Sequence, residues 1–404
     1  MGRLPGASTV TESPTNTEHR TLISGVGKSQ VGRRLNRSDL DLTVEACDRA
    51  LADAGVARAD VDGLVAWPGE WPAARGFCGP AVGRVKDALG IDPAWHAGMQ
   101  DGPSQLGAVM SAVMAVASGY VRHVLVYRTT SEATGQAGGG RNTTSPADVV
   151  GVIGLQEWLR PFGAVTAAHW LAMVAQRYMH ESGATREQIG GLPVSTRRWA
   201  GLNPDAVYRT PITIDDYLSA RMISDPLCLY DCDVPVDGSV AILVSAVETR
   251  ADLRAPVRIE AMGGKLASRP LWDQWADPLN LPQRDSARHL WSRTTLRPSD
   301  VDVAQLYDGF SILTIVWLEA AGFCDPYEGA AFVAGGQRIG PGGSLPLNTG
   351  GGQLSGGRLH GFGFLHEAVA QLRGETGERQ VHGAETAFVG TGGGPLGGCL
   401  LLTT

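Results

Sequence analysis

Residues 340–363 read GPGGSLPLNTGGGQLSGGRLHGFG, a run that contains ten glycines together with Arg358 and His360. Because glycine has no Cβ, such a loop lets the backbone approach a ligand closely. The residues that follow, FLHEAVAQLRGETG, have the apolar spacing of a helix and end at a glycine. The start of that helix directs amide N–H groups and the positive end of its dipole towards a ligand. We interpret the run as a ligand-binding loop; the alternative is a mobile surface loop.

The composition indicates a globular protein with a large core, since 43% of the 404 residues are hydrophobic and 19% are charged. This length predicts two or three domains, or two similar halves. The net charge of −7 argues against nucleic acid as a partner. The small-residue run at 106–119 is too short to span a bilayer, and the start of the chain lacks the apolar segment of a signal peptide. We therefore expect a cytoplasmic protein that does not enter a membrane.

The cysteines have the spacing of neither a disulfide framework nor a zinc site, so we expect reduced thiols and no metal. They are Cys47, Cys78, Cys228, Cys232, Cys324 and Cys399.

The two halves of the chain repeat one pattern. VARADVDGLVAW (56–67) and LRPSDVDVAQLY (296–307) each place Asp-Val-Asp before an apolar strand, and each follows a predicted helix. A loop, a helix and a further strand come next in both halves. This alternation predicts an α/β fold made of two similar units, with a ligand site beyond the strand ends and near helix N-termini.

These patterns divide the chain into a disordered tail at 1–20, a first half at 21–255 and a second half at 256–404. The less regular section at about 128–229 is interpreted as an inserted loop or lid region. The first half is predicted to contain strands at Thr21–Gly27, Val121–Tyr127 and Val236–Ala246, and helices at Asp39–Ala54 and Ser104–Gly119.

Two such halves with these glycine loops resemble the thiolase superfamily, in particular its sterol-carrier and lipid-transfer branch. QLYDGFSILTIVWLEAAGFC (305–324) is similar to that branch's His-Asp-Cys-Phe segment and the helix after it. NTGGGQLSGGRLHGFG (348–363) is similar to its Asn-Pro-Ser-Gly-Gly…Gly-His-Pro loop, and the central region ends in a similar turn at Val236-Asp237-Gly238. The resemblance implies a thiolase-like α/β fold, with two duplicated α/β halves in a layered α/β/α/β/α architecture.

The departures from that family concern its catalytic residues. A thiolase uses a cysteine nucleophile at a buried helix N-terminus, and this chain has no cysteine near the matching residues Gly102–Ser104. Its second cysteine is missing from the loop GTGGGPLGGC, where Cys399 lies beyond the glycines. Tyr307 and Arg358 replace the histidines of the two motifs. Acyl transfer through a cysteine thioester is therefore not supported, and Ser104 has no evident base near it in the sequence.

Tyrosine in place of histidine at position 307 resembles the thiolase-like aldolases of bacterial steroid side-chain degradation. The resemblance implies retro-aldol cleavage of a steroid β-hydroxyacyl-CoA to a ketone and a short acyl-CoA, with CoA only as part of the substrate and no cofactor. That group has a further tyrosine near position 358, where this chain has arginine. Two alternatives stay open: a catalytically silent scaffold or lipid carrier, and an acyl-CoA acyltransferase that uses no cysteine.

Retro-aldol cleavage requires a base for the β-hydroxyl proton, donors for the enolate and an acid for the α-carbon. Tyr307 ends a predicted strand and His360 precedes a predicted helix, so we expect both at one edge of the second half as acid/base groups. Arg358 would bind the CoA phosphates or hold the enolate oxygen. Asp308 would orient a neighbour, or alternatively cap the following helix. The glycines predicted to approach the substrate or CoA are Gly351, Gly352, Gly392 and Gly393.

The aldolases that this chain resembles act with a partner of OB-fold and zinc-ribbon type. The resemblance implies a homodimer flanked by two such partners, that is, a heterotetramer. Trp67 and Trp71, in the loop WPGEWP, are candidate anchors for the partner because aromatic residues dominate interface hot spots. The alternative for both tryptophans is ordinary loop packing.

Overall fold

The computed structural model describes residues 16–70, 75–99, 102–137, 159–164, 166–266, 279, 281–394 and 396–404. The strands of the main sheet are β1 (Thr21–Lys28), β2 (Gly63–Ala66), β3 (Trp95–Gly98), β4 (His123–Ser131), β7 (Asp237–Ala246), β8 (Val257–Leu266), β9 (Val303–Leu306), β10 (Thr386–Thr391) and β11 (Leu396–Thr403), and a small second sheet contains β5 (Met222–Ser224) and β6 (Leu227–Cys228). The helices are α1 (Asp39–Ala54), α2 (Val82–Leu89), α3 (Gly107–Ala117), α4 (Glu132–Gly135), α6 (Ala167–Ser182), α7 (Arg186–Leu202), α8 (Ile214–Ser219), α9 (Pro282–Trp291), α10 (Ser311–Ala320), α11 (Gly329–Val333) and α12 (Phe362–Leu372). None of these described helices has the length and apolar character needed to cross a bilayer.

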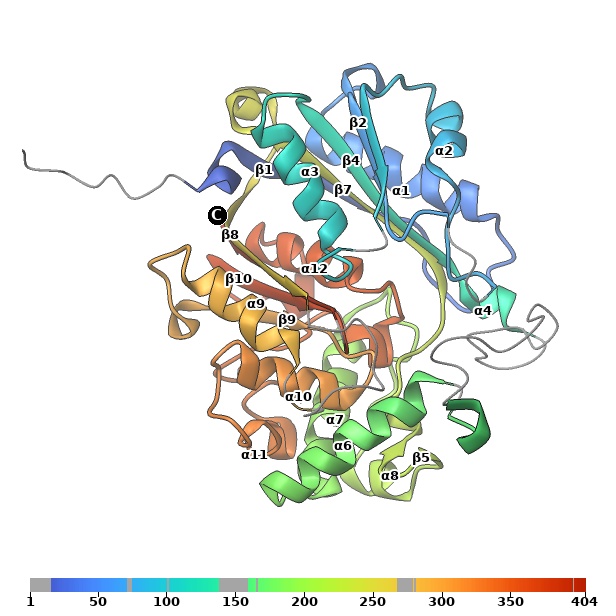
Figure 1. Cartoon of the computed structure of the whole chain (residues 1–404), viewed down its shortest axis with the longest axis vertical. Helices are drawn as coiled ribbons and strands as arrows, with labels where there is room; N and C mark the ends of the chain where they lie inside the picture. The colour runs from blue at the N-terminus through green and yellow to red at the C-terminus, as the bar shows by residue number, and fades with distance from the viewer. Residues whose placement is uncertain are drawn as a thin grey trace, which may run out of the picture.

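The main sheet has the strand order β3-β2-β4-β7-β1-β8-β11-β10-β9 and contains the internal repeat (Figure 1). In the first half β1 pairs with β7 and β7 with β4, both antiparallel, and β4 pairs with β2 in parallel. In the second half β8 pairs with β11, β11 with β10 and β10 with β9 in the same three orientations. The duplication predicted from the sequence is therefore confirmed, with β3 as an extra edge strand and a short β1–β8 pairing as the junction.

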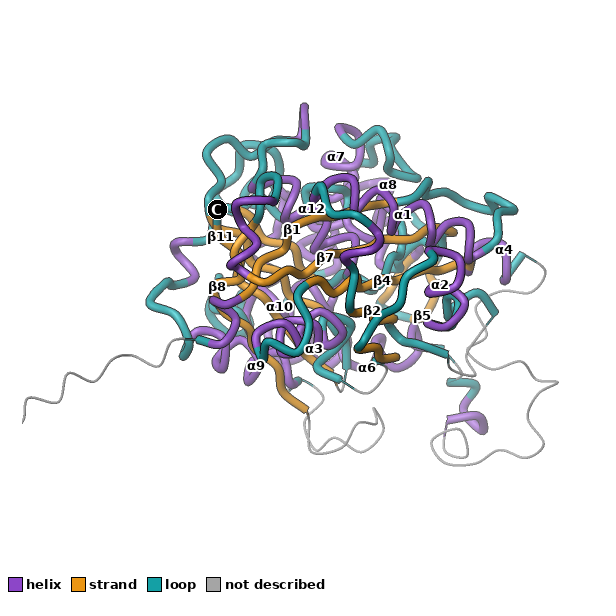
Figure 2. The backbone as a smooth tube through the Cα atoms, turned by 90° about the horizontal axis from the view of Figure 1, so that it is seen from above, coloured by secondary structure: helices purple, strands orange, loops and turns teal. Residues whose placement is uncertain are grey.

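Helices form the other layers. α12 packs on β9 and β10 of the second half and also on β1 and β7 of the first. α3 packs on β4 and β7, while Pro103 just before it faces Gly264 of β8. α1 covers the strands of the first half. α9 covers β8 and β11 on the opposite side of the sheet from Pro103, so Gly263, which precedes Gly264 on β8, faces α9. The layers are therefore α1, the strands of the first half, α3 with α12, the strands of the second half, and α9. This is the expected α/β/α/β/α layering, and Figure 2 shows the strands running between helices.

Local sequence explains why α1 has the predicted bounds. Ser38 accepts a hydrogen bond from the Asp41 N–H at 3.0 Å, which caps the first turn. Gly55 ends the helix with a φ of 75°, a conformation that glycine adopts without steric cost. One face of the helix is buried, and its residues are Leu42, Thr43, Ala46, Cys47, Ala50, Leu51 and Ala54.

The prediction of a disordered tail at 1–20 is wrong for the last four of these residues. Residues 17–20 form a 3-10 turn, η1, and the Glu18 side chain is fully buried. Arg293 donates two hydrogen bonds to the Glu18 carboxylate, at 2.9 and 2.6 Å. This buried pair is formed by residues 275 positions apart, so a local pattern could not have predicted it. Residues 1–15 lie outside the described part of the chain.

The section predicted as a lid, 128–229, also differs from that expectation where it is described. β4 continues to Ser131, and α6 and α7 pack on α10 and α11 of the second half. α7 is buried over most of its length although Pro193 lies inside it. Its glycines allow neighbouring backbone to pack closely against the helix, since a Cβ on Gly191 would lie 2.1 Å from the Val333 carbonyl oxygen. These helices are part of the core; residues 138–158 and 165 lie outside the described residues.

Candidate active site

A cavity of about 950 Å³ lies where the first half meets the glycine-rich run. Segments distant in the sequence line it: α4 and the residues after it, the start of α6, and the helical turn η4 (Leu229–Asp231) with the loop that follows. Arginine side chains in the lining are Arg33, Arg34, Arg197, Arg221 and Arg358. Apolar and aromatic ones include Phe77, Ile223, Tyr230, Phe310 and Leu354. This combination of guanidinium groups and apolar surface suits a ligand that has both phosphate and apolar parts.

Tyr307 lies directly after β9, and its N–H donates to the Gly390 carbonyl of β10 at 2.9 Å. Its residue surface is 8% exposed. Burial raises the pKa of the phenol, the Asp233 carboxylate raises it further, and Arg358 acts in the opposite direction. The phenol is therefore protonated at neutral pH. Gly309 makes room for it, since a Cβ there would lie 2.7 Å from the ring.

Asp308 holds the glycine-rich run rather than the helix that follows it. Its carboxylate accepts from the Gln353 N–H at 2.8 Å and from the Asn348 side-chain amide at 3.2 Å. Burial raises the pKa of Asp308 to about 7, against the backbone N–H groups that favour its charged form. The cap residue of α10 is Phe310, and it has no side-chain cap bond. The helix-capping alternative for Asp308 is therefore wrong.

Arg358 lies in the cavity wall between two acidic side chains. Its Nη2 donates to Glu132 Oε1, and its Nε lies 3.6 Å from Asp233 Oδ2. Burial alone would lower the pKa of the guanidinium, but the Asp233 and Glu132 carboxylates outweigh it and raise the pKa above its ordinary value. The result is a permanent cation at a fixed position, with 15% of its side chain exposed. Such a group can stabilise a developing negative charge without moving.

His360 lies behind that wall rather than in the cavity lining. Arg128 Nη2 lies 2.7 Å from His360 Nδ1, and because arginine only donates, Nδ1 accepts and the proton is on Nε2. Nε2 faces Glu132 Oε2 at 3.9 Å. Burial lowers the pKa of Arg128 to about 10, and its guanidinium lies over the rings of Trp67 and Phe77 at 4.9 and 5.0 Å. His360 therefore joins Arg128 to Glu132, which in turn holds Arg358.

The same contacts correct the expectation for Trp67. Its residue surface is 8% exposed, and its ring packs on Arg128 and His360. The prediction that Trp67 is an exposed anchor for a partner is wrong, because the buried arginine takes up the aromatic face. Trp71 lies outside the described residues.

The four glycines predicted to approach the ligand are at two places, and none of them is in the lining of the large cavity. Gly351 and Gly352 lie next to α7 and Asp308: a Cβ on Gly352 would be 2.0 Å from Asp308 Oδ2. Gly392 and Gly393 pack beside Ser104 and Leu313. In both loops the absent Cβ lets protein groups come close to each other.

Ser104 ends the segment Gly102–Ser104, which the resemblance found in the sequence places at the expected nucleophile position. It precedes α3, has a φ of 61° and is 1% exposed. Its Oγ forms a 2.7 Å hydrogen bond with Thr391 Oγ1. A hydroxyl paired with another hydroxyl in the core has no base to activate it. The geometry therefore agrees with the sequence argument against a serine nucleophile.

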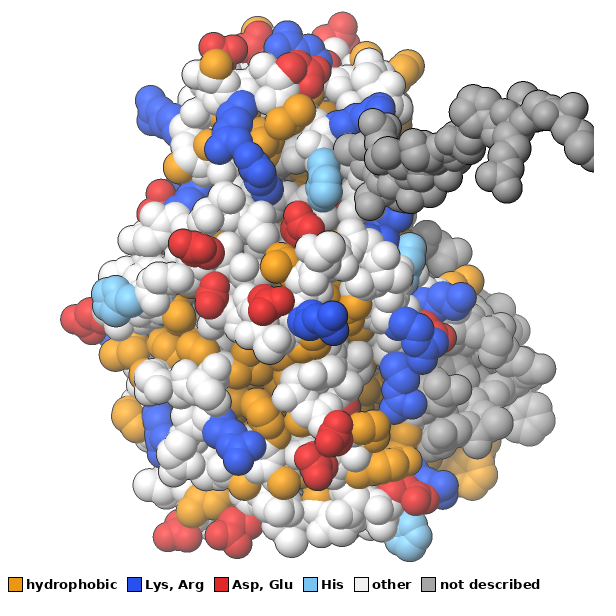
Figure 3. Space-filling model, turned by 90° about the vertical axis from the view of Figure 1, so that its left-hand side faces the viewer, with side chains coloured by type: hydrophobic (Ala, Val, Ile, Leu, Met, Phe, Trp, Pro, Cys, Tyr) orange, Lys and Arg blue, Asp and Glu red, His pale blue; other side chains and the backbone are white. Residues whose placement is uncertain are grey.

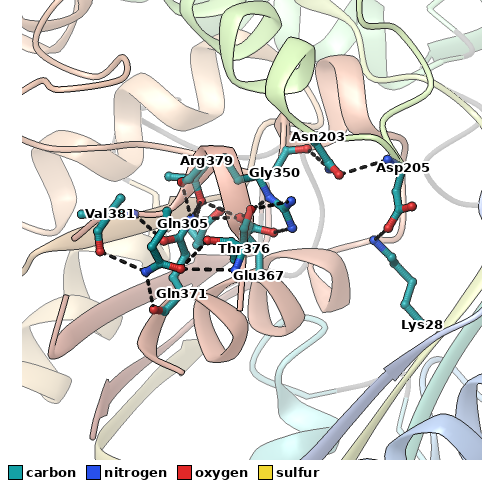
Figure 4. A network of polar contacts seen from close by, with 12 residues as sticks. Lys28, Asn203, Asp205, Gln305, Gly350, Glu367, Gln371, Thr376, Arg379 and Val381 are labelled. Carbon is teal, nitrogen blue, oxygen red and sulfur yellow. Dashed lines mark hydrogen bonds and ion pairs between the residues drawn. The ribbon is translucent and has the colours of Figure 1, made fainter. Parts of the chain in front are cut away.

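A polar network supports the back of the glycine-rich run (Figure 4). Glu367 of α12 accepts from Arg379 Nε at 3.0 Å and from Thr349 Oγ1 at 2.9 Å. Asn203, at the end of α7, donates to the Gly350 carbonyl at 2.7 Å. Its Oδ1 accepts from the Asp205 N–H at 3.1 Å. Strongly held neighbours thus fix the loop that carries Arg358.

The structure places Arg358 near Tyr307, and it places His360 near Glu132, which holds Arg358. Tyr307 and His360 therefore lie in one region, and Asp308 follows Tyr307 in the chain. Sequence reasoning missed Arg128, Glu132 and Asp233. Arg128 and Glu132 follow a predicted strand, and charged residues at the carboxyl end of a strand were a signal that could have been used. Asp233 lies in LYDCDVPVDG between other aspartates, and no local pattern distinguishes it from Asp231, which is buried elsewhere and hydrogen bonded to Tyr217 and Ser311.

Comparisons with known proteins give a consistent result. Residues 264–399 match the family model described as thiolase C-terminal domain-like. The chain is 38% identical over 389 residues to 17-hydroxy-3-oxo-4-pregnene-20-carboxyl-CoA lyase of Mycobacterium tuberculosis, covering 94% of this chain and 98% of that protein. It is 35% identical over 391 residues to a steroid side-chain-cleaving aldolase of Thermomonospora curvata, covering 94% and 97%.

Solved structures extend these similarities. The Ltp2-ChsH2(DUF35) aldolase superposes with a TM-score of 0.84 at 33% identity, covering 96% of this chain and 98% of that one. Human mitochondrial 3-ketoacyl-CoA thiolase superposes with a TM-score of 0.69 at 14% identity, covering 96% and 100%, and so shares the fold alone.

Proposed function

The chain belongs to the thiolase superfamily, and within it to the aldolases that cleave steroid side chains, and from this premise we propose that it splits a β-hydroxyacyl-CoA by a retro-aldol reaction. The substrate is a steroid side-chain CoA thioester, and the products are a ketosteroid and a short acyl-CoA. The observation that carries the proposal is Arg358 in the cavity wall with the buried Tyr307 near it, together with serine instead of cysteine before α3.

The residues of the site supply the groups that this reaction needs. Arg358 holds the enolate oxygen as charge develops on the thioester, because it is a fixed cation in the cavity wall. Tyr307, protonated at neutral pH, donates the proton that the α-carbon receives. His360 does not line the cavity, and in this proposal it acts through Glu132 and Arg128 on the position of Arg358.

The other arginines of the cavity are assigned to CoA. Arg197 donates to Ser355 Oγ at 2.8 Å, and its guanidinium lies over the rings of Tyr208 and Tyr230 at 5.5 and 5.7 Å. Arg33 donates to the Tyr208 hydroxyl, so this cluster is held in place by its own contacts. Preplaced guanidinium groups are suited to phosphate oxygens. CoA enters only as part of the substrate, and no cofactor is included.

The proposal also includes a complex. The solved relative is a complex by name, Ltp2-ChsH2(DUF35), and this supports a partner for this chain. Figure 3 shows apolar side chains gathered in a broad band on the face that it presents, and exposed bands of this kind mark interaction sites. We assign the chain to a homodimer flanked by two OB-fold partners, working in the cytoplasm, where buried thiols such as Cys47 and Cys399 stay reduced.

A panel of β-hydroxyacyl-CoAs, with and without the candidate partner, tests the reaction. The expected result is formation of a ketone and an acyl-CoA in equal amounts, measured by liquid chromatography with mass spectrometry. Saturable binding of the panel without turnover in any combination would contradict the aldolase and favour a silent carrier.

A further inference from the structure

We propose that Gln353 is a positioning residue for the acid of the reaction: its side-chain amide donates a hydrogen bond to the phenol oxygen of Tyr307 and holds the charge that this oxygen acquires when its proton leaves. This inference rests on the proposed retro-aldol function, in which Tyr307 protonates the α-carbon. It starts from a need of the site, because a buried phenol that gives up its proton leaves a buried negative charge.

The backbone of Gln353 is fixed next to the segment of Tyr307. Its N–H donates to Asp308 Oδ1 at 2.8 Å, and Asp308 follows Tyr307 in the chain. Its carbonyl accepts from the Val234 N–H at 2.9 Å. The preceding residue allows the close approach, since a Cβ on Gly352 would lie 2.0 Å from Asp308 Oδ2. The side chain of Gln353 therefore starts from a point that two backbone hydrogen bonds hold close to the acid.

The side chain of Gln353 is buried, and its amide reaches the phenol. Only 3% of the residue surface is exposed. Burial raises the pKa of Tyr307 and the Asp233 carboxylate raises it further, whereas Arg358 lowers it. A hydrogen bond from the Gln353 side chain also lowers the pKa of the phenol, which is the effect of a donor. Since Nε2 is the donor of this side chain, the amide meets the phenol with its nitrogen.

The contact between the amide and the phenol is loose. Neither Nε2 nor Oε1 of Gln353 has a hydrogen bond of ordinary geometry to a described residue, so the amide stands near the phenol without being tightly bound to it. Catalytic hydrogen bonds often shorten only in the complex with substrate. A neutral donor binds a phenolate more strongly than a phenol, because hydrogen bonds to an ionised oxygen are shorter and stronger. The amide thus favours the state that follows proton transfer.

A small cavity fits this orientation of the amide. Gln353 and Gln305 of β9 are both in the lining of a cavity of about 50 Å³, together with Phe364, whose ring packs on Tyr307. Gln305 Oε1 is also buried without a hydrogen bond to a described residue. A polar cavity of this size has room for a water molecule, which can donate to both amide oxygens. Oε1 of Gln353 then faces the water, and Nε2 is left for the phenol.

The proton transfer balances without another reactant. The O–H bond of Tyr307 breaks, and its proton forms a C–H bond with the electron pair of the thioester enolate. The electrons of the O–H bond stay on the phenol oxygen, which accepts from Gln353 Nε2. The proton released from the β-hydroxyl group returns to the phenolate and restores the acid. The sum is one β-hydroxyacyl-CoA giving one ketone and one acyl-CoA.

The first test is Gln353→Met, which keeps the length of the side chain and removes the donor. With the partner present and 17-hydroxy-3-oxo-4-pregnene-20-carboxyl-CoA as the probe, kcat should fall by about 10–10². KM should stay within about twofold, since Gln353 is not in the lining of the large cavity. The matched control is Gln337→Met, which changes an exposed glutamine and should leave kcat within about twofold.

A double-mutant cycle separates this role from a structural one. In a Tyr307→Phe background, Gln353→Met should have no further effect on kcat, because no phenol oxygen is left to hold. A general defect of folding or packing would instead lower kcat by the same factor in both backgrounds.

A titration measures the contact without any turnover. A fluorinated tyrosine, whose phenol is more acidic, is inserted at position 307 of the full chain, and fluorine NMR follows its ionisation. Gln353→Met should raise the pKa of this phenol by about 1–2, which corresponds to the expected fall in kcat. Gln353→Glu should raise the pKa further, since a carboxylate donates no hydrogen bond and repels the phenolate.

The outcomes distinguish the positioning residue from the reaction. An unchanged pKa at position 307 in Gln353→Met would overturn the inference and leave the proposed function in place. Full turnover in Gln353→Glu would also overturn it, because the amide oxygen would then be the atom that meets the phenol. A wild-type protein that binds the probe and never cleaves it would overturn the proposed function, whereas the titration would still decide whether Gln353 donates to Tyr307.

Discussion

At the scale of single residues, the hydroxyl of Tyr307 is the group whose removal is most informative. Tyr307→Phe deletes one oxygen from a buried ring and leaves its packing on Phe364. If the hydroxyl delivers the α-carbon proton, turnover should fall by about 10²–10⁴ with the melting temperature nearly unchanged. Steady-state kinetics and thermal unfolding measure the two effects, with the exposed Tyr120→Phe as control. An unchanged rate would remove Tyr307 from the mechanism.

The cysteines are expected to be dispensable for chemistry. Burial raises the pKa of the Cys399 thiol above its ordinary value, so it is not a thiolate, and it donates to the Gly263 carbonyl at 3.6 Å. Cys399→Ala and Cys78→Ala should therefore retain turnover within about twofold. A folded variant of either that loses activity would favour a thiolase mechanism instead.

Sequence reasoning found the residues of the site that belong to recognisable segments. Tyr307 and Arg358 could be predicted because each replaces a histidine within a motif. Asp233 and Glu132 could not be predicted, since their places beside Arg358 depend on backbone segments that meet only in the folded chain. The prediction for Trp67 was wrong for the same reason, because the sequence of its loop does not show that Arg128 packs on its ring.

At the scale of elements, α12 carries a group that makes stability depend on pH. Burial, together with the charges of Lys28 and Arg379, lowers the pKa of His366 to about 3. The folded protein keeps this ring neutral, whereas the unfolded chain binds a proton below about pH 6.5. The free energy of unfolding should therefore fall as the pH drops from 6.5 towards 3, by at most about 1.4 kcal/mol per pH unit from this residue.

Urea unfolding at several pH values between 7 and 4 measures this dependence. His366→Gln should flatten it, because glutamine takes up no proton on unfolding. A variant with the same slope as the wild type would show that other groups cause the loss of stability in acid.

The loop before α12 should be intolerant of a side chain at one glycine. Gly352→Ala would place a Cβ 2.0 Å from Asp308 Oδ2 at a φ of 54°, so the carboxylate and the loop must separate. We expect a loss of about 1–3 kcal/mol in unfolding free energy and a large fall in turnover. Gly363→Ala, within α12 and in ordinary contact with Leu359, is the control and should fold normally. Equal behaviour of the two variants would show that Asp308 does not depend on this close approach.

Elements with clear terminal signals were predicted closely, and those with conflicting signals were not. α1 has Ser38 before it and Gly55 after it, and its bounds agree with the sequence prediction. The sequence did not predict α7, because Gly190, Gly191 and Pro193 oppose helix formation locally. Packing against the second half outweighs that preference, and packing of this kind is not visible in a local pattern.

At the scale of the whole molecule, the prediction concerns assembly. Co-expression with an OB-fold and zinc-ribbon partner should give a complex larger than a homodimer by size-exclusion chromatography with light scattering. Turnover should rise in that complex, because a partner covering the cavity would exclude water from the enolate. A lone homodimer with full activity would contradict the need for a partner.

The position of β1 in the sheet has a consequence for synthesis of the chain. β1 leaves the ribosome before both of its neighbours, β7 and β8, which follow it by more than 200 residues. During translation its two edges have no native partner until most of the protein has been made, and contacts of such sequence separation form slowly. Nascent chains that end before residue 246 should therefore stay open and bind chaperones, and the fold should close only late.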